Sequence, residues 1–203
     1  MKTLIRNAFL SAVLALVTLA PAAARSLFRQ PTFDGPPPAS FSFPGEGTVE
    51  VAFSPHEGAE QLVIKSIDSA QKSIRLLAYS FTNPNIVRAL VRAKKRGVDV
   101  AIVVDYKNNI EEDRYGKARA ALNTLREVDV TVKVIKVYPI QHDKAIVVDS
   151  KHVETGSFNF SQAAENINSE YVVVMWDSPK VAAAFLKHWR RNDAQAVDYR
   201  PTY

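Results

Sequence analysis

The sequence predicts an α/β fold in which a mixed, mostly parallel β-sheet carries helices on both faces. Two patterns support this. Short β-rich apolar runs alternate with amphipathic runs from residue 48 onward, which is typical of strand–helix–strand units. The run Asp99–Asp105 is apolar between its terminal charges, as in a strand buried on both faces. At 203 residues, the chain is long enough for one such domain.

Each element follows from local composition. The expected strands are rich in β-branched residues and lie at Thr48–Phe53, Ser73–Phe81, Asp99–Asp105, Val130–Tyr138, Lys144–Asp149, His152–Thr155 and Tyr171–Trp176. The expected helices lie at Gly58–Gln71, Asn83–Arg96, Tyr115–Glu127, Ser161–Glu165 and Pro179–Arg191. Pro84 suits a first helical turn, and Gly97 suits a helix end. We find no internal repeat in the sequence.

The N-terminus has the pattern of a secretory signal peptide. Lys2 and Arg6 precede an apolar run of 13 residues, Ala8–Ala20, and small residues follow up to Ala24. Such a run is short for a bilayer span, so we expect cleavage after Ala24 rather than a retained anchor. The sequence therefore predicts a periplasmic or secreted protein with no stable membrane insertion after cleavage.

Composition divides the rest of the chain. We expect a signal peptide at 1–24, a proline-rich extended leader at 25–47 and the folded domain at 48–203. The formal net charge of +5 and the sequence pI of about 9.4 are compatible with a polyanionic partner without requiring one. The absence of cysteine excludes disulfides and thiolate chemistry.

Polar residues at fixed spacings form a pattern late in the domain. It reads H-x-K-x4-D-x6-G-S-x-N, and it is filled by His142, Lys144, Asp149, Gly156, Ser157 and Asn159. We call these six residues the signature. Side chains two apart in an extended chain share a face, so His142 and Lys144 should point to one spot. A turn at Ser150-Lys151 and a tight backbone excursion at Gly156 would return Ser157 and Asn159 beside them. The plain alternative is an ordinary hairpin with a polar end.

The signature resembles that of the phospholipase D superfamily, whose members cleave phosphodiester bonds through a histidine nucleophile. From Val49 onward the chain is similar to the small secreted nucleases of that superfamily, which are often carried on bacterial plasmids. This likeness is carried by segments such as Leu77–Thr82, Lys94–Val100, Pro139–Lys144 and Val153–Phe160. The resemblance favours a nuclease over a lipid hydrolase.

Phosphodiester cleavage requires a nucleophile, positive charge for the phosphate oxygens and a proton for the leaving oxygen. Histidine suits the nucleophilic role because its neutral form is well populated near pH 7, and we assign that role to His142. Lys144 would supply charge, with Asn159 and Ser157 as neutral donors. The resemblance implies that Glu170 accepts a hydrogen bond from His142 and fixes its tautomer, in the manner of a triad aspartate.

The remaining signature residue, Asp149, lies five positions after Lys144 and should point to the opposite face. We expect it to be structural, with its carboxylate bound to backbone near the turn. Lys94-Lys95-Arg96 suits a solvated helix end, whereas Lys107-Asn108-Asn109 follows a strand and could border the groove. The aromatic residues near the signature suit the core better than base stacking, namely Tyr79, Phe81, Phe158 and Phe160.

The leaving group needs a second acid, and the chain has three other histidines. We expect His56 in a solvated loop, His152 at an exposed turn and His188 in a structural position on the last helix. Superfamily members with two signatures pair two histidines, and one signature per chain can do the same in a C2 dimer. The sequence therefore predicts a homodimer in which the partner's His142 is the general acid.

The leading hypothesis is a metal-independent, sequence-nonspecific endonuclease that acts on DNA, with RNA as a further candidate substrate and no cofactor. The first alternative is a phospholipase D acting on lipid head groups. A metal phosphodiesterase using His142, Asp143, Asp149 and His152 is disfavoured, because the spacing is not a recognised ligand pattern and Lys144 would repel a cation. A silent nucleic-acid-binding module is disfavoured because the chemical set is intact.

Overall fold

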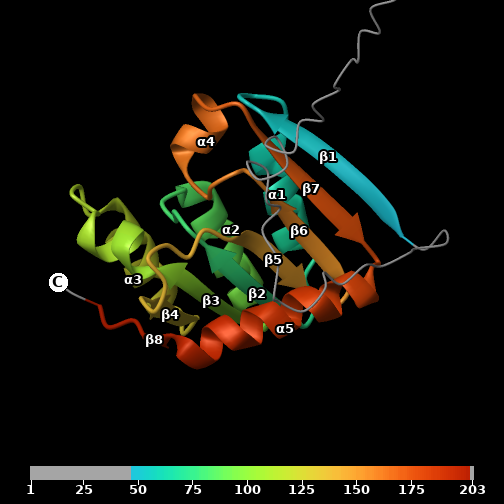
Figure 1. Ribbon diagram of the computed structural model, residues 1–203. Helices are drawn as coiled ribbons and strands as arrows, with labels where there is room; N and C mark the ends of the chain where they lie inside the picture. The colour runs from blue at the N-terminus through green and yellow to red at the C-terminus, as the bar shows by residue number, and fades with distance from the viewer. Residues whose placement is uncertain (1–46, 202–203) are drawn as a thin grey trace, which may run out of the picture. The chain divides into compact units, whose positions relative to one another are not determined.

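The computed structural model describes residues 47–201, which form one sheet with helices on both faces (Figure 1). The expected signal peptide and almost all of the leader lie outside the described residues. The strands are β1 Thr48–Ser54, β2 Ser73–Ala78, β3 Asp99–Asp105, β4 Thr131–Ile135, β5 Lys144–Val148, β6 His152–Gly156, β7 Glu170–Trp176 and β8 Val197–Asp198. The helices are α1 Ala59–Asp68, α2 Pro84–Lys95, α3 Lys117–Arg126, α4 Gln162–Asn166 and α5 Pro179–Gln195, with a π-helical turn η1 at Lys107–Glu111.

The strand order across the sheet is β1-β7-β6-β5-β2-β3-β4-β8. The mixed α/β class is confirmed, but the sheet is mostly antiparallel where we expected mostly parallel strands. Among the described strands, only the β2–β3 and β3–β4 pairings are parallel, and these strands are joined through α2 and α3. No helix separates β4 from β5 or β5 from β6, and without a helical crossover successive strands reverse direction.

Alternating side chains divide the core between the two faces. Leu76, Ile102 and Ile146 pack with α1, α2 and α3 in the largest apolar cluster. Their odd-numbered neighbours pack against α5 on the other face, where Leu77 and Val103 meet Trp189. The helical layers on the two faces are thus confirmed, and within residues 47–201 α5 is the one helix that crosses its face (Figure 1).

The observed strand boundaries differ most from the expected ones at the C-terminal ends of β2 and β4. The expected strands Ser73–Phe81 and Val130–Tyr138 end early, at Ala78 and Ile135, and the remaining residues form loops. The short elements η1 and β8 were not expected from the sequence. The shortened strands matter for function because their loops surround the signature. None of the helices in residues 47–201 is long and apolar enough to cross a membrane.

Candidate active site

The site is built where the C-terminal end of β2 meets the N-terminal end of β5. Lys144 pairs with Ala78 at the last rung of this antiparallel ladder. One residue further, the Tyr79 amide donates to the Asp143 carbonyl at 2.9 Å. This pairing fixes the backbone that carries both His142 and Lys144.

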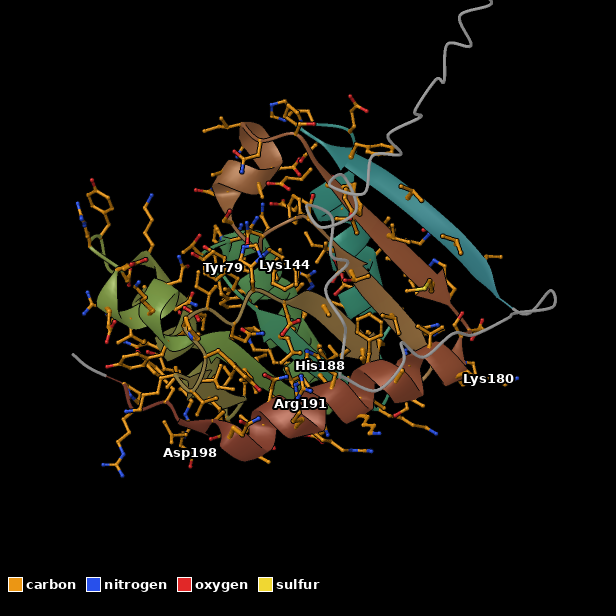
Figure 2. The ribbon with its side chains drawn as sticks, in the orientation of Figure 1. Tyr79, Lys144, Lys180, His188, Arg191 and Asp198 are labelled. Atoms are coloured by element: carbon orange, nitrogen blue, oxygen red, sulfur yellow. The ribbon has the colours of Figure 1, made fainter. Side chains whose placement is uncertain are left out.

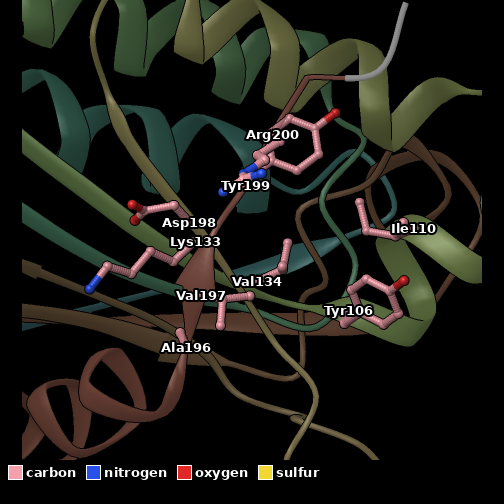
Figure 3. A pocket seen from close by; sticks show the side chains of 9 residues that line it. All are labelled: Tyr106, Ile110, Lys133, Val134, Ala196, Val197, Asp198, Tyr199 and Arg200. Atoms are coloured by element: carbon pink, nitrogen blue, oxygen red, sulfur yellow. The ribbon is translucent and has the colours of Figure 1, made fainter.

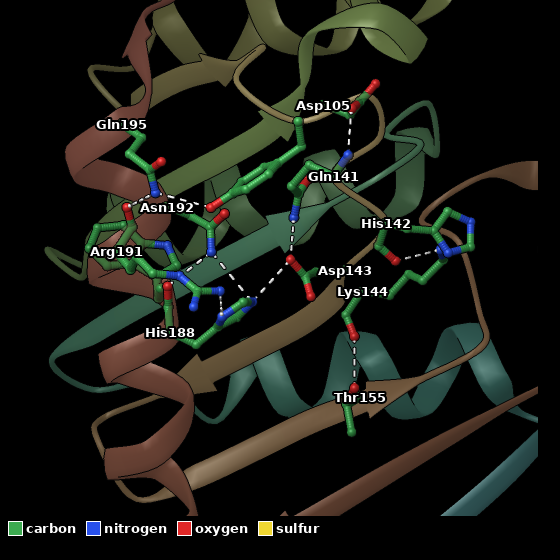
Figure 4. A network of polar contacts seen from close by, with 12 residues as sticks. Asp105, Gln141, His142, Asp143, Lys144, Thr155, His188, Arg191, Asn192 and Gln195 are labelled. Atoms are coloured by element: carbon green, nitrogen blue, oxygen red, sulfur yellow. Dashed lines mark hydrogen bonds and ion pairs between the residues drawn. The ribbon is translucent and has the colours of Figure 1, made fainter. Parts of the chain in front are cut away.

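His142 and Lys144 come together as the extended spacing predicts. The Lys144 ammonium donates to the His142 carbonyl at 2.9 Å (Figure 4). The Tyr79 ring contacts both, with its centroid 4.6 Å from the imidazole centroid and 5.0 Å from the Lys144 Nζ (Figure 2). His142 is exposed, whereas Lys144 is only 6% exposed. The imidazole is therefore accessible to a substrate, and the ammonium is held behind it.

The burial of Lys144 changes its chemistry. Removal of the ammonium from water lowers its pKa below the usual 10.5, while the carboxylates of Glu170 and Asp143 act in the opposite direction. A partly desolvated cation interacts more strongly with a phosphate than one in bulk water. This residue is therefore suited to neutralise phosphate oxygens.

The β5–β6 hairpin returns the rest of the signature, as expected. Ala145 pairs with Thr155, and the Thr155 hydroxyl donates to the Lys144 carbonyl at 2.9 Å. Gly156 is extended strand rather than a left-handed excursion, which corrects our reason for a glycine here. A Cβ at this position would lie 2.2 Å from the Tyr171 carbonyl oxygen on β7. The close approach of β7 therefore requires glycine.

The last signature residues lie between β6 and β7. The Ser157 amide donates to the Tyr171 carbonyl at 3.2 Å, and the Tyr171 amide donates to the Ser157 hydroxyl at 3.1 Å. The serine hydrogen thus remains free to be donated to a ligand. The Asn159 side-chain oxygen is buried and has no hydrogen-bond partner within residues 47–201. The Ser157 hydroxyl is therefore available to a bound anion, whereas this amide oxygen can only accept a hydrogen bond.

A hollow of about 560 Å³ brings these groups together. Its lining includes the five residues to which we assigned catalytic roles, namely His142, Lys144, Ser157, Asn159 and Glu170. Glu170 accepts a hydrogen bond from Asn168 at 3.0 Å, and no hydrogen bond joins it to His142 in the described part of the chain. Its electrostatic effect instead reaches Lys144. The tautomer-fixing role of Glu170 therefore stays a prediction.

Asp149 is placed outside this hollow, at the far end of β5. Its carboxylate accepts from the amides of Gln71, Lys72 and Ser73 at 2.7–2.9 Å. Burial acts to raise its pKa, but these three donors outweigh burial and lower it. The carboxylate thus binds backbone, as expected, and the four-residue metal-ligand set considered above is not assembled within residues 47–201.

A family model described as cardiolipin synthase, PLD-like domain, matches residues 63–192. The chain belongs to the phospholipase D superfamily. It is 35% identical over 146 residues to a phospholipase D of Rickettsia conorii, which covers 72% of this chain and 70% of that protein. Among solved structures, it resembles Nuc, a phospholipase D family member from Salmonella typhimurium, with a TM-score of 0.73 and 50% identity over 76% of this chain and 99% of that one. NucT from Helicobacter pylori shares the fold, with a TM-score of 0.65 at 24% identity over 76% of this chain and all of that one.

Within this superfamily domain, one of the other three histidines differs from expectation. His56 is exposed, as expected, and does not line the hollow. His152 is buried rather than exposed, because its Nδ1 accepts from the Asp177 amide at 2.9 Å and its ring packs on Trp176. His188 lies 3.1 Å from the Asp143 carboxylate, next to the signature. His152 was misplaced because it is the first residue of β6, directly after a turn, and its neighbours in the sequence do not distinguish a buried strand residue from an exposed turn residue.

Tyr79, expected in the core, instead contacts His142 and Lys144. Phe81, Phe158 and Phe160 are fully buried, as expected. Asn109 is buried rather than bordering a groove, and its carboxamide bonds the Tyr79 carbonyl and the Phe81 amide. No local pattern marks Tyr79, because its place beside the signature depends on the pairing of β2 with β5.

A larger hollow of about 770 Å³ lies at the β4–β8 edge, away from the signature (Figure 3). It is lined by Tyr106, Lys133 and the last described residues, and its Lys133 is paired with Asp193 at 2.7 Å. It contains none of the signature residues. The smaller hollow is therefore the candidate active site, because the imidazole, ammonium, hydroxyl and carboxamide of the signature meet there.

Proposed function

We propose that this enzyme is a metal-independent, sequence-nonspecific endonuclease that hydrolyses DNA, and also RNA, through a phosphohistidine intermediate. The observation that supports it best is the hollow shared by exposed His142, buried Lys144, Ser157, Asn159 and Glu170. A neutral imidazole nitrogen attacks phosphorus, and the P–O bond to the leaving oxygen breaks as the N–P bond forms. Water then attacks the same phosphorus and returns the imidazole.

Lys144 provides the positive charge that the two negatively charged transition states need. Its ammonium is partly desolvated and fixed against the His142 carbonyl, so it is preorganised for a phosphate. The Ser157 hydroxyl and the Asn159 carboxamide add neutral donors. The chemistry calls for no divalent cation, because a protein cation already occupies that role. Glu170 would orient His142 once substrate draws them together.

The general acid is proposed to come from a second copy of the chain. Among the described residues, His142 is the one histidine that lines the hollow. A C2 homodimer that brings two such hollows face to face would let the partner's His142 protonate the leaving oxygen. The expected signal peptide would deliver this dimer to the periplasm or the medium.

A preference for nucleic acid rests on the likeness to small secreted nucleases and on the 50% identity to Nuc. Phospholipase D activity is the second candidate, because the Rickettsia relatives carry that name. An apolar strip also favours it. Val51 pairs with Val173 and Phe53 with Tyr171 across β1 and β7, and Val51, Phe53 and Tyr171 are each about half exposed.

The test incubates the mature protein with plasmid DNA, RNA and phosphatidylcholine vesicles in excess chelator, with His142→Ala as the matched control. We expect cleavage of both nucleic acids, no release of choline and no activity in the variant. Choline release without nucleic-acid cleavage would transfer the assignment to the lipid. Activity that requires added magnesium or zinc would refute the mechanism.

A further inference from the structure

A chain of polar contacts connects α5 to the backbone that carries the proposed nucleophile (Figure 4). His188 Nε2 lies 3.1 Å from Asp143 Oδ2, and Arg191 Nη2 lies 2.9 Å from His188 Nδ1. Asp143 is the residue between His142 and Lys144. From the sequence, Asp143 had a role only in the disfavoured metal site and His188 was expected to be structural, so neither the signature nor its proposed roles account for these contacts.

The contacts define the hydrogen bonds and the tautomer. Arginine only donates, so His188 Nδ1 must be an unprotonated acceptor facing Arg191. The ring proton is then on Nε2 and is donated to the Asp143 carboxylate. Asn192 Nδ2 approaches the same Nε2 at 3.4 Å but donates at 2.9 Å to the His188 carbonyl, which is its better partner. His188 is therefore held as a directed donor.

Asp143 is restrained on both sides of the chain. Its Oδ2 also accepts from Gln141 Nε2 at 2.8 Å, and its carbonyl accepts from the Tyr79 amide. The main-chain N–H of Gln141 in turn donates at 2.8 Å to the buried Asp105 carboxylate. The peptide from Gln141 to Lys144 is thus anchored to β3 through Asp105, to β2 through Tyr79 and to α5 through His188.

Of these three anchors, Asp105 and Tyr79 belong to the sheet or directly follow one of its strands, whereas His188 lies on helix α5. Before Lys144, where β5 begins, the hydrogen bond from the Tyr79 amide to the Asp143 carbonyl is the last backbone contact with β2 among the described residues. A small rotation of the Asp143 peptide would turn His142 and Lys144 together, since they flank it. Displacements of about 1 Å at reacting groups can cost about a hundredfold in rate.

We propose that His188 is a positioning residue, which holds the Asp143 peptide so that His142 and Lys144 face the same phosphate. This inference rests on the proposed function for its kinetic consequence, although the restraint on His142 itself does not depend on it. His188 acts through Asp143 and does not contact substrate. Arg191 contributes by keeping the His188 tautomer that donates to Asp143.

The test compares His188→Leu, which cannot donate, with His188→Gln, whose side-chain amide reaches about as far as Nε2. The matched control is Lys187→Ala, an exposed neighbour on α5. With DNA and with bis(p-nitrophenyl) phosphate, His188→Leu should lower kcat about 10- to 100-fold with little change in KM. His188→Gln should recover most of that loss, and Lys187→Ala should have no effect.

A second readout follows the nucleophile directly. Imidazole ¹⁵N shifts of His142, identified by their loss in His142→Ala, should change in His188→Leu and return in His188→Gln. Thermal melts show whether each variant is folded. If His188→Leu does not fold, Arg191→Met removes only the exposed donor and should shift the same His142 signals by a smaller amount.

The inference is overturned if folded His188→Leu keeps wild-type kcat, or if His188→Gln loses as much as His188→Leu, because packing alone would then explain the effect. Unchanged His142 signals in folded variants would also overturn it. An inactive wild-type enzyme on every phosphodiester would refute the proposed function instead. The His142 signals would still decide the role of His188.

Discussion

Glu154 offers a measurable test of the physical reasoning, because it is a carboxyl group in the middle of the sheet. It is 1% exposed and lies on β6 between Ile146 and Val174 of the neighbouring strands. Neither of its carboxyl oxygens has a hydrogen-bond partner within residues 47–201. Burial without a partner disfavours the charged form and raises the pKa of Glu154 well above its ordinary 4.5.

The sign of the effect on stability follows from this shift. The folded protein binds the proton more tightly than the unfolded chain, so the stability associated with Glu154 is complete below pH 4.5. It is then lost at about 1.4 kcal/mol per pH unit until the pH passes the raised pKa. Between pH 4.5 and pH 7 the loss can reach at most about 3 kcal/mol.

Glu154→Gln keeps the shape but removes the titration. We expect the variant and the wild type to have similar unfolding free energies near pH 4.5, and the variant to become the more stable protein as the pH rises. The assay is urea unfolding at fixed temperature from pH 4.5 to 8, with equal m-values as the check on two-state behaviour. Glu127→Gln, at an exposed helix end, is the control and should parallel the wild type. A Glu154→Gln difference that stays constant with pH would refute the reasoning.

Four further predictions concern the site and the assembly. Asp149→Ala should lower the unfolding free energy by about 2 kcal/mol near pH 7. Because the pKa of this carboxyl is lowered in the folded protein, its stabilising contribution is lost as the pH falls below 3.8, and the difference measured in urea titrations should shrink there. Lys144→Ala removes the cation and Lys144→Arg replaces a point charge with a planar fork, so each should reduce turnover about 100-fold or more. Near-wild-type rates in the arginine variant would contradict the role of Lys144. Sedimentation equilibrium should give about twice the 22.5 kDa chain mass, less the signal peptides, whereas a fully active monomer would refute the shared site. DNA affinity should fall steeply with salt and vary little with sequence, and a sharp consensus among cleavage sites would count against phosphate-driven binding.

The common direction of His142 and Lys144 could be predicted from the sequence, because residues two apart in an extended chain point to the same side. His142 and Lys144 are two apart, and Lys144 to Val148 is an apolar strand, so their shared direction follows from the pleat. The opposite direction of Asp149 follows from the same rule. These inferences needed only local structure.

The wrong or missing parts depended on contacts between distant segments. Gly156 was interpreted through its own backbone, whereas the carbonyl that excludes a side chain belongs to Tyr171 on another strand. The direction of β5 depends on pairing with β2, which no local pattern specifies. Tyr79 and His188 reach the site from β2 and α5, and their spacing from the signature carries no period that could reveal them.

The position of β7 has a consequence for when the enzyme can become active. Glu170 begins a strand that lies between β6 and β1, and its partner at that end is Ser54, 116 positions earlier in the chain. A polypeptide that ends before β7 lacks one wall of the hollow and leaves β1 without its neighbour. Closure of the catalytic hollow must therefore await the late pairing of the first strand with the seventh. A chain whose synthesis has not yet reached β7 would therefore lack an assembled site.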